Sequence, residues 1–374
     1  MNATRILAVL VKEFIQLTRD RLTYALILAM PVVQLLLFGY AINNDPHHLP
    51  TAVLVQDHGV FARSTLGAIE RSGYFDITET ARTPAELDRA MALGRVQFAI
   101  TIPADFSRRV VRGDRAQILV EADAADPSAT GSAIAALSAL PQEALKHELT
   151  GALATGPAAA PPFEVVVHRR YNPEAISAYN IVPGLLGVIL SMTLVMMTAL
   201  GVTREYERGT MESLLATPVK PLEVMIGKLA PYVLVGLIQT VVILVLARVL
   251  FDVPFSGGWG ALLSGILLFI VGSLALGFLI STVARNQLQA MQMSVFYIFP
   301  SLLLSGFMFP FRGMPLWAQI IGDVIPVTHF LRIVRGALLK GLGFADLWQS
   351  LGALMLFVVI VVSLAMARYR TTLD

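Results

Sequence analysis

The residues of this chain that could do chemistry are few, and they form no catalytic motif. No GxxxxGK[ST], HExxH or GxSxG pattern is present, and Gly227-Lys228 lacks the upstream glycines and the following Ser or Thr of a phosphate-binding loop. The absence of cysteine excludes disulfides, thiol catalysis and cysteine-based zinc sites. His47, His48 and His58 have no carboxylate beside them at a metal-ligand spacing, so we interpret them as solvated loop residues. We therefore expect no catalytic residue, metal site or cofactor on this chain.

A charged segment at 203–228, TREYERGTMESLLATPVKPLEVMIGK, is the first candidate for a binding surface. Its charged side chains are interleaved with apolar ones, and Thr217-Pro218 ends the helical pattern. A second helical piece begins near Pro221, because proline is favoured in the first turn of a helix. We interpret 203–217 as a short helix presented to a partner protein; the alternative is a solvated loop beside the membrane.

The second candidate segment, 304–343, is cut by Pro310, Pro315 and Pro326 into pieces too short to cross a membrane. Short helices are expected at 316–321 and 328–339. Non-helical backbone is tolerated at membrane depth only where protein or water surrounds it. We therefore predict a re-entrant hairpin that closes the outer end of a pathway, with the three prolines at this outer gate. The alternative is an external amphipathic loop.

The composition is that of a membrane protein. Of the 374 residues, 56% are hydrophobic and 14% are charged, and the mean hydropathy is +0.69; an average soluble domain has about 25% charged residues. A soluble chain of this length could not bury so much apolar surface, whereas a chain in lipid can expose it. The net charge of +2 and the lack of a Lys/Arg run exclude nucleic acid as an expected partner.

Apolar runs of about the 20 residues that a helix needs to cross a bilayer predict six transmembrane helices. The runs lie at 22–42, 176–202, 231–251, 259–283, 288–304 and 350–367. Before them, 1–21 has apolar and charged residues at helical spacing, which predicts a cytoplasmic amphipathic helix. The alternative is that 1–21 simply extends the first span, 22–43.

Positive charges predict the orientation of the spans. If the N-terminus is cytoplasmic, Lys and Arg are more frequent in the cytoplasmic connections than in the short outer ones. Trp259, Trp317 and Trp348 then all lie near the outer face, and tryptophan is enriched at membrane interfaces. We predict a multi-pass protein with both termini in the cytoplasm.

The long segment between the first and second spans, 44–175, has an ordinary soluble composition and is long enough to fold around its own core. Runs rich in β-branched residues predict strands at 51–56, 96–103, 116–122 and 163–169, and helices are expected at 60–73, 83–94 and 103–113. The predicted fold class is an α-helical polytopic membrane protein with six transmembrane helices, spans two to six lying in 176–374, plus an inserted α/β extracytoplasmic domain at 44–175.

Three segments carry a resemblance to a known family: KEFIQLTRDR before the first span, ERGTMESLLATPVKPLEVMIGK after the second, and SGFMFPFRGMP…IPVTHFLRIVRG after the fifth. In these segments and in its whole layout, the chain resembles the type-2 ABC exporter permeases with a large extracytoplasmic domain after the first span. The resemblance implies that two permease subunits pair with two ATP-binding cassette ATPase subunits, which bind ATP and magnesium. It assigns ATPase coupling to Glu205, Arg208, Gly209, Thr210, Glu212, Leu214 and Leu215.

The resemblance also implies the partners and the location. The second permease subunit is another copy of this chain or a paralogue, a periplasmic adaptor is a further candidate partner, and the complex lies in the lipid bilayer of the bacterial inner membrane. ATP hydrolysis is expected on the separate ATPase chain, so this chain is a transporter subunit rather than an enzyme.

The expected function is export of a hydrophobic or amphipathic substrate, drug-like amphiphiles first, out of the cytoplasm or inner leaflet. Three alternatives remain open at this point. The first is a membrane-anchored sensor or adaptor that acts through 44–175. The second is export of lipid-linked or polysaccharide cargo. The third, an ion-driven carrier, is disfavoured because the spans lack the buried Asp, Glu or His of a proton relay.

Overall fold

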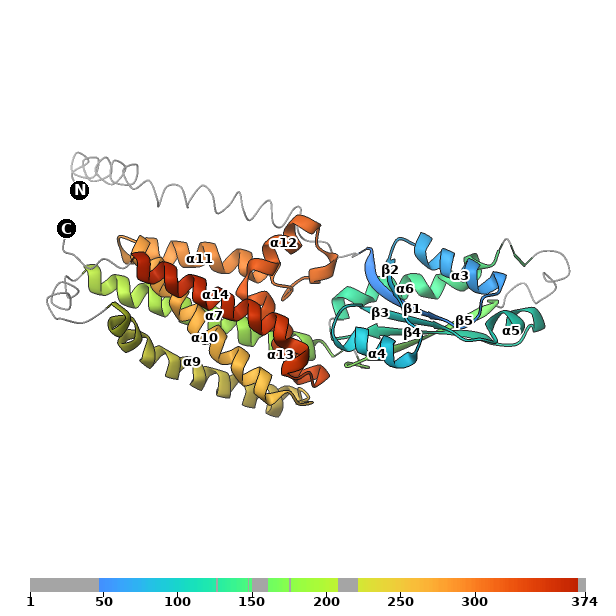
Figure 1. Cartoon of the computed structure of the whole chain (residues 1–374), viewed down its shortest axis with the longest axis horizontal. Coiled ribbons are helices and arrows are strands. Elements are labelled where there is room, and N and C mark those ends of the chain that lie inside the picture. The colour runs from blue at the N-terminus through green and yellow to red at the C-terminus, as the bar shows by residue number, and fades with distance from the viewer. Residues whose placement is uncertain are drawn as a thin grey trace, which may run out of the picture.

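The computed structural model describes residues 47–125, 127–146, 148–149, 161–174, 176–207 and 221–368. These residues form an α/β domain and a bundle of helices, which lie end to end along the long axis of the molecule (Figure 1). The predictions made for 1–21, for the first span at 22–43 and for 208–217 concern residues outside this description.

A five-stranded mixed sheet in the order β2-β1-β3-β4-β5 forms the centre of the α/β domain. β1 pairs in parallel with β2 and β3, β4 is antiparallel to β3, and β5 is parallel to β4. The four strands expected from the sequence are confirmed, but β2 was not expected. It lies at the edge of the sheet with Asp76, Thr78 and Thr80 exposed, so only Phe75 and Ile77 give an apolar signal in the sequence. The strands are β1 (Leu49–Val55), β2 (Phe75–Thr80), β3 (Phe98–Ile102), β4 (Ala116–Asp123) and β5 (Phe163–Arg170).

Helices cover both faces of this sheet. α3 (Val60–Arg71), α5 (Phe106–Arg112) and α6 (Pro127–Ala144) share a core with one face, and α4 (Pro84–Ala92) packs on the other. α4 begins with an arrangement close to a capping box, in which the Thr83 hydroxyl accepts from the N–H of Glu86 (3.3 Å) and the Glu86 carboxylate accepts from the N–H of Arg82, one residue before the N-cap (2.7 Å). α6 was not predicted, because its alanine-rich sequence shows little contrast between helix faces and contains Pro141.

A buried carboxylate fills the carboxyl ends of the parallel strands β1 and β3. Asp57 accepts hydrogen bonds from the N–H groups of Gly59 (2.7 Å) and Ser107 (2.5 Å), at the beginning of α3 and α5. Burial opposes its ionisation, but these donors hold the pKa of Asp57 below its usual value. Parallel sheets commonly bind ligands at this edge. Here the chain's own carboxylate occupies the two helix N-termini.

The bundle contains helices of very different lengths. The long helices are α7 (Ser177–Glu207), α9 (Pro221–Phe251), α10 (Trp259–Val283) and α14 (Phe344–Arg368). α11 (Gln287–Leu304) is shorter. It leads through the 3-10 turn η3 (Phe311–Gly313) into two short helices, α12 (Leu316–Val324) and α13 (Pro326–Lys340). Two short helices were expected in 304–343, and both are confirmed.

Within the described residues, four helices are long and apolar enough to cross a membrane: Ser177–Glu207, Leu229–Phe251, Trp259–Val283 and Phe344–Arg368. They correspond to the predicted second, third, fourth and sixth spans. The predicted fifth span forms α11 but is not among the four, because Gln287, Gln289 and Gln292 lower its hydropathy. The count of six spans therefore stays a prediction.

α10 occupies the centre of the bundle because small residues let its neighbours approach closely. A Cβ on Gly277 would lie 2.6 Å from the carbonyl oxygen of Val195 on α7. By contrast, α9 and α14 expose rows of apolar side chains, for example Val249, Leu250 and Leu356. Such exposed apolar helix faces are expected where lipid is the solvent.

Candidate functional site

The candidate outer gate, 304–343, folds back on itself at the end of the bundle that faces the α/β domain (Figure 1). Each of the three prolines assigned to the candidate outer gate lies at the beginning of one element. Pro310 precedes η3, Pro315 precedes α12, and Pro326 is the first residue of α13. The prolines therefore mark the breaks between short helices, as expected from their sequence positions.

α13 is deeply buried although it is too short to span. It has 15 residues, and at 1.5 Å per residue it measures only about 22 Å. Phe330 stacks on Phe269 of α10 with ring centroids 4.2 Å apart, and Phe269 lies well inside α10. Toward the α/β domain, the carbonyl of Leu338 accepts from the N–H of Ser256, which precedes α10 (2.9 Å). α13 thus fills the domain-facing part of the bundle between α7, α10 and α14.

Polar contacts join α12 and α13 into one unit. The Thr328 hydroxyl donates to the carbonyl of Gly322 (2.6 Å), and the guanidinium of Arg332 pairs with Asp323 at 2.7 Å. The same guanidinium lies over the ring of Phe311, 4.7 Å from its centroid. Gly322 also packs against the end of α11, where an added Cβ would lie 2.6 Å from the carbonyl oxygen of Leu304. α12 and α13 are therefore expected to move together rather than separately.

The candidate coupling segment, 203–217, is described only at its beginning. Glu205 lies in the last turn of α7, and 208–217, with Arg208, Gly209, Thr210, Glu212, Leu214 and Leu215, lies outside the described residues. The end of α7 is joined to the start of α11. Glu207 accepts from the backbone N–H (2.7 Å) and the side-chain amide (2.5 Å) of Gln287, and Arg204 donates to the Gln287 side-chain oxygen (3.3 Å).

Neutral polar side chains lie where α7 and α11 pack together. Ser191 on α7 is buried, as are Ser294 and Ser301 on α11, whereas the buried Thr198 of α7 packs against Gly277 of α10. Ser294 and Ser301 donate to carbonyls of their own helix, each at 2.8 Å. Small polar residues of this kind commonly lie where membrane helices pack closely.

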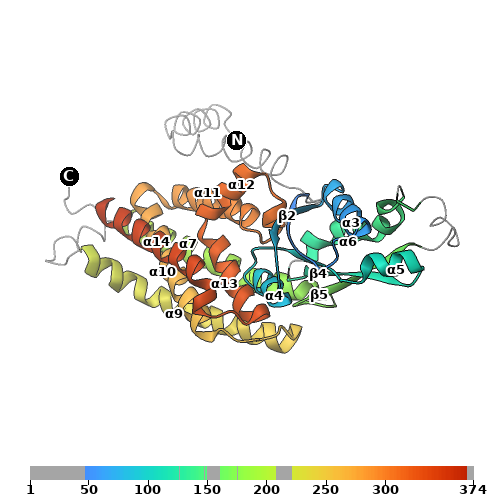
Figure 2. The same ribbon diagram turned by 45° about the vertical axis from the view of Figure 1, so that its right-hand side comes forward.

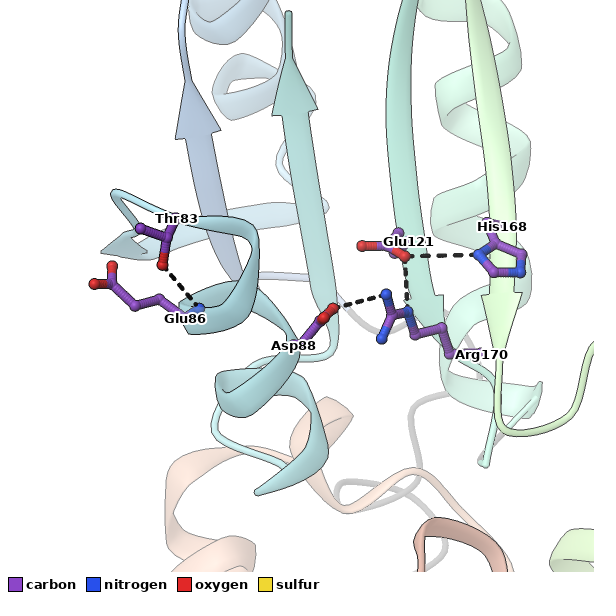
Figure 3. Close-up of polar contacts among 6 residues, drawn as sticks. All are labelled: Thr83, Glu86, Asp88, Glu121, His168 and Arg170. Carbon is purple, nitrogen blue, oxygen red and sulfur yellow. Dashed lines mark hydrogen bonds and ion pairs between the residues drawn. The ribbon is translucent and has the colours of Figure 1, made fainter.

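An ion-pair network stiffens the sheet on the face that carries α4. Figure 3 shows Arg170 of β5 between Glu121 of β4 and Asp88 of α4. Both ion pairs have distances of 2.7 Å, and His168 lies 3.6 Å from Glu121. Figure 3 also shows the cap of α4 at Thr83. In the described ranges no group of three or more His, Asp or Glu side chains could hold a metal ion.

Sequence reasoning missed the residues that join the α/β domain to the bundle. Lys340 at the end of α13 pairs with Asp123 at the end of β4 (2.5 Å). Asn180, in the first turn of α7, donates to the carbonyl of Ala125 (2.9 Å) and accepts from Arg335 of α13 (2.8 Å). The only available signal was the presence of Arg335 and Lys340 in a segment predicted to lie on the outer side.

Comparison with known proteins identifies the family. The model of the family described as ABC-2 family transporter protein matches residues 21–367. The chain is 30% identical over 339 residues to the probable multidrug ABC transporter permease YbhS of Escherichia coli (strain K12), covering 90% of this chain and 89% of that one. It is 26% identical to the probable multidrug ABC transporter permease YbhR of the same strain, covering 96% of each chain. It is 27% identical to that strain's inner membrane transport permease YhhJ, covering 97% of this chain and 96% of that one. The protein therefore belongs to the ABC-2 family of ABC transporter permeases.

Proposed function

We propose that this chain is the transmembrane subunit of an ATP-driven exporter that moves a hydrophobic or amphipathic, drug-like substrate out of the cytoplasm or the inner leaflet. The observation that carries the proposal is the position of α13. This short helix blocks the domain-facing end of the bundle without crossing it, as a gate must. The printed names of two relatives, probable multidrug ABC transporter permease, favour drug-like cargo.

ATP is supplied from outside this chain. The sequence has no phosphate-binding motif, and permeases of this family normally work with an ATP-binding cassette ATPase, which binds ATP and magnesium. The contact proposed for it is 203–217. Because Glu207 is hydrogen bonded to Gln287, a displacement of this segment would reach α7 and α11 together. A second permease subunit, the same chain or a paralogue, completes the transporter, and a periplasmic adaptor remains a candidate partner.

The proposed orientation places six spans in the bacterial inner membrane, with the α/β domain outside and both termini in the cytoplasm. Trp259, Trp317 and Trp348 all lie on elements at the domain-facing end of the bundle and are exposed, which suits an outer membrane interface. Arg204 and Arg368 lie at the opposite end, which suits the cytoplasmic side.

Cysteine labelling should confirm this orientation, because the natural chain has no cysteine and gives no background. Arg112→Cys on α5 and Arg204→Cys on α7 both replace exposed residues. In spheroplasts, an impermeant maleimide should label Arg112→Cys at once and label Arg204→Cys only after permeabilisation. The reverse pattern would place the α/β domain in the cytoplasm and would rule out the proposed orientation.

The substrate class is best tested on the purified complex of this permease with its ATPase. Amphipathic drugs should raise its rate of ATP hydrolysis several-fold, whereas oligosaccharides and lipid-linked sugars should leave the rate unchanged. Stimulation by the sugars alone would replace drug-like cargo with the lipid-linked or polysaccharide alternative. If no ATPase chain binds the permease, the exporter proposal fails and the sensor or adaptor alternative is favoured.

A further inference from the structure

The α/β domain meets the bundle through side chains at the end of β4, at the start of α7 and along α13. We name Asp123, Ala125, Asn180, Arg335 and Lys340 the interdomain cluster. Both views of the molecule place this end of the domain, with α4, beside the end of α13 (Figures 1 and 2). The cluster therefore joins the domain directly to the helix that fills the domain-facing end of the bundle.

Lys340 is an anchored charge rather than a solvated lysine. Its side chain is 9% exposed and its partner Asp123 is 12% exposed. The ammonium also donates to the carbonyl of Met91 at the end of α4 (3.4 Å) and lies 4.9 Å from the ring centroid of Tyr171. Burial and the nearby Asp123 raise the pKa of Tyr171 to about 12, so the ring stays neutral. Removing either member of such a pair leaves a buried charge without compensation.

Arg335 makes the second connection from α13. It donates to the carbonyl of Gly306, just after α11 (3.0 Å), and to the side-chain oxygen of Asn180 (2.8 Å). Asn180 is buried, and its amide donates to the carbonyl of Ala125 (2.9 Å). A continuous chain of hydrogen bonds thus runs from the α/β domain through α7 to α13 and the end of α11.

The two connections converge on the turn 123–125, which is itself rigid. The Asp123 carboxylate accepts from the N–H of Ala125 (3.1 Å), and the N–H of Ala124 donates to the carbonyl of Arg170 (3.2 Å). Arg170 is in turn fixed by Glu121, as Figure 3 shows. The sheet and α13 are therefore joined without a flexible segment, and a displacement of the domain relative to the bundle must either move α13 or break these bonds.

We propose that the interdomain cluster sets the position of α13, with Lys340 and Arg335 as positioning residues, so that displacement of the α/β domain opens the end of the bundle that α13 closes. The proposal rests on the proposed function for the gating role of α13. A ligand or partner protein that shifts the domain at 123–125 would then control access to the pathway. In this proposal the α/β domain takes part in gating.

The test measures access to α13 without requiring transport. Val334 on α13 is fully buried, and Val334→Cys, close to it in size, gives a single reporter in a cysteine-free chain without removing a polar contact of α13. In the full-length protein an impermeant maleimide should label this reporter slowly. Adding Lys340→Met or Asp123→Asn should raise the labelling rate by about tenfold or more, because each leaves a buried charge unpaired. The exchanged pair Lys340→Asp with Asp123→Lys should label more slowly than Lys340→Asp alone.

The matched control is the other ion pair between domain and bundle, Arg89 with Asp346. The Arg89 side chain is 55% exposed, and Asp346, although only 16% exposed, also accepts from the N–H of Gly343 (3.3 Å), so Arg89→Gln leaves the carboxylate with a partner and should leave the labelling rate near that of the parent. The proposal is overturned if Lys340→Met and Asp123→Asn both label at the parent rate, or if Arg89→Gln accelerates labelling as much as they do. The labelling needs neither ATP nor substrate. An unchanged labelling rate would therefore contradict the role of the interdomain cluster alone, whereas a failure of the exporter proposal would appear as an absence of ATP-driven transport.

Discussion

Reversing or introducing a charge in the proposed coupling segment is expected to separate the permease from its ATPase. Glu205→Arg, Glu212→Arg and Leu214→Asp should each weaken the pull-down of the ATPase, because breaking a buried contact at an interface costs about 2–5 kcal/mol, a factor of tens to thousands in affinity. A few residues usually provide most of the binding energy of an interface, so single substitutions should suffice. ATP-driven export should fall with assembly.

Two further variants locate the coupling more closely. Arg285 is exposed between α10 and α11, and its side chain makes no hydrogen bond or ion pair with the described residues. Arg285→Glu should therefore leave assembly and export near the parent level. Gln287→Ala removes the side-chain contacts of α11 with Glu207 and Arg204. It should leave assembly intact while reducing export per ATP hydrolysed. Normal assembly and export in all three coupling variants would exclude 203–217 as the coupling segment.

Replacing Gly322 with alanine is expected to disable the proposed gate formed by α12 and α13. The added Cβ would lie 2.6 Å from the carbonyl oxygen of Leu304 and from a ring carbon of Phe311, so α12 must move away from α11. The carbonyl of Gly322 also accepts from Thr328, so the movement would be passed on to α13. Overpacking of this kind costs typically about 1–3 kcal/mol, which corresponds to roughly a 5- to 100-fold change in the balance between closed and open gate.

The measurement is export by proteoliposomes together with leakage of a small dye in the absence of ATP. Gly322→Ala should raise leakage and lower ATP-driven export. Gly352→Ala is the matched control, because a Cβ there meets nothing within 4 Å and alanine favours the helix. Parent-like leakage and export in a well-folded Gly322→Ala variant would show that α12 and α13 do not form the gate.

Elements with strong periodic or apolar signals could be predicted from the sequence. α10 has the predicted bounds, Trp259–Val283. Its long apolar run follows a glycine pair and ends at a charged loop, so both ends of the helix are marked in the sequence. α9 begins at Pro221, where the sequence predicted the start of a helical piece, and this piece continues without a break into the span predicted from 231. β2 and α6 were missed because β2 contains only two apolar residues, Phe75 and Ile77, and α6 is rich in alanine.

The interdomain contacts could not be predicted, because they join residues far apart in the chain. Arg335 and Asn180 are separated by 155 positions, and Lys340 and Asp123 by 217. In the sequence, Arg335 and Lys340 are simply positive residues on the outer side of a span, where they weaken the orientation argument. Only the packing of α13 gives them partners: Asn180 of α7 and the carbonyl of Gly306 for Arg335, and Asp123 of the α/β domain for Lys340. The prolines at 310, 315 and 326 were more informative, because a break in helical structure is a local property.

The proposed export of an amphipathic substrate, driven by ATP hydrolysed on a partner, can be followed in a reconstituted system. The direct measurement is uptake of a fluorescent amphiphile into inside-out proteoliposomes that contain the permease and its ATPase. Uptake should require Mg-ATP, should stop when the ATPase is omitted or replaced by a hydrolysis-deficient variant, and should not be driven by an imposed proton gradient. Uptake driven by that gradient without the ATPase, or ATP hydrolysis by the complex without uptake of any amphiphile tested, would contradict the assignment.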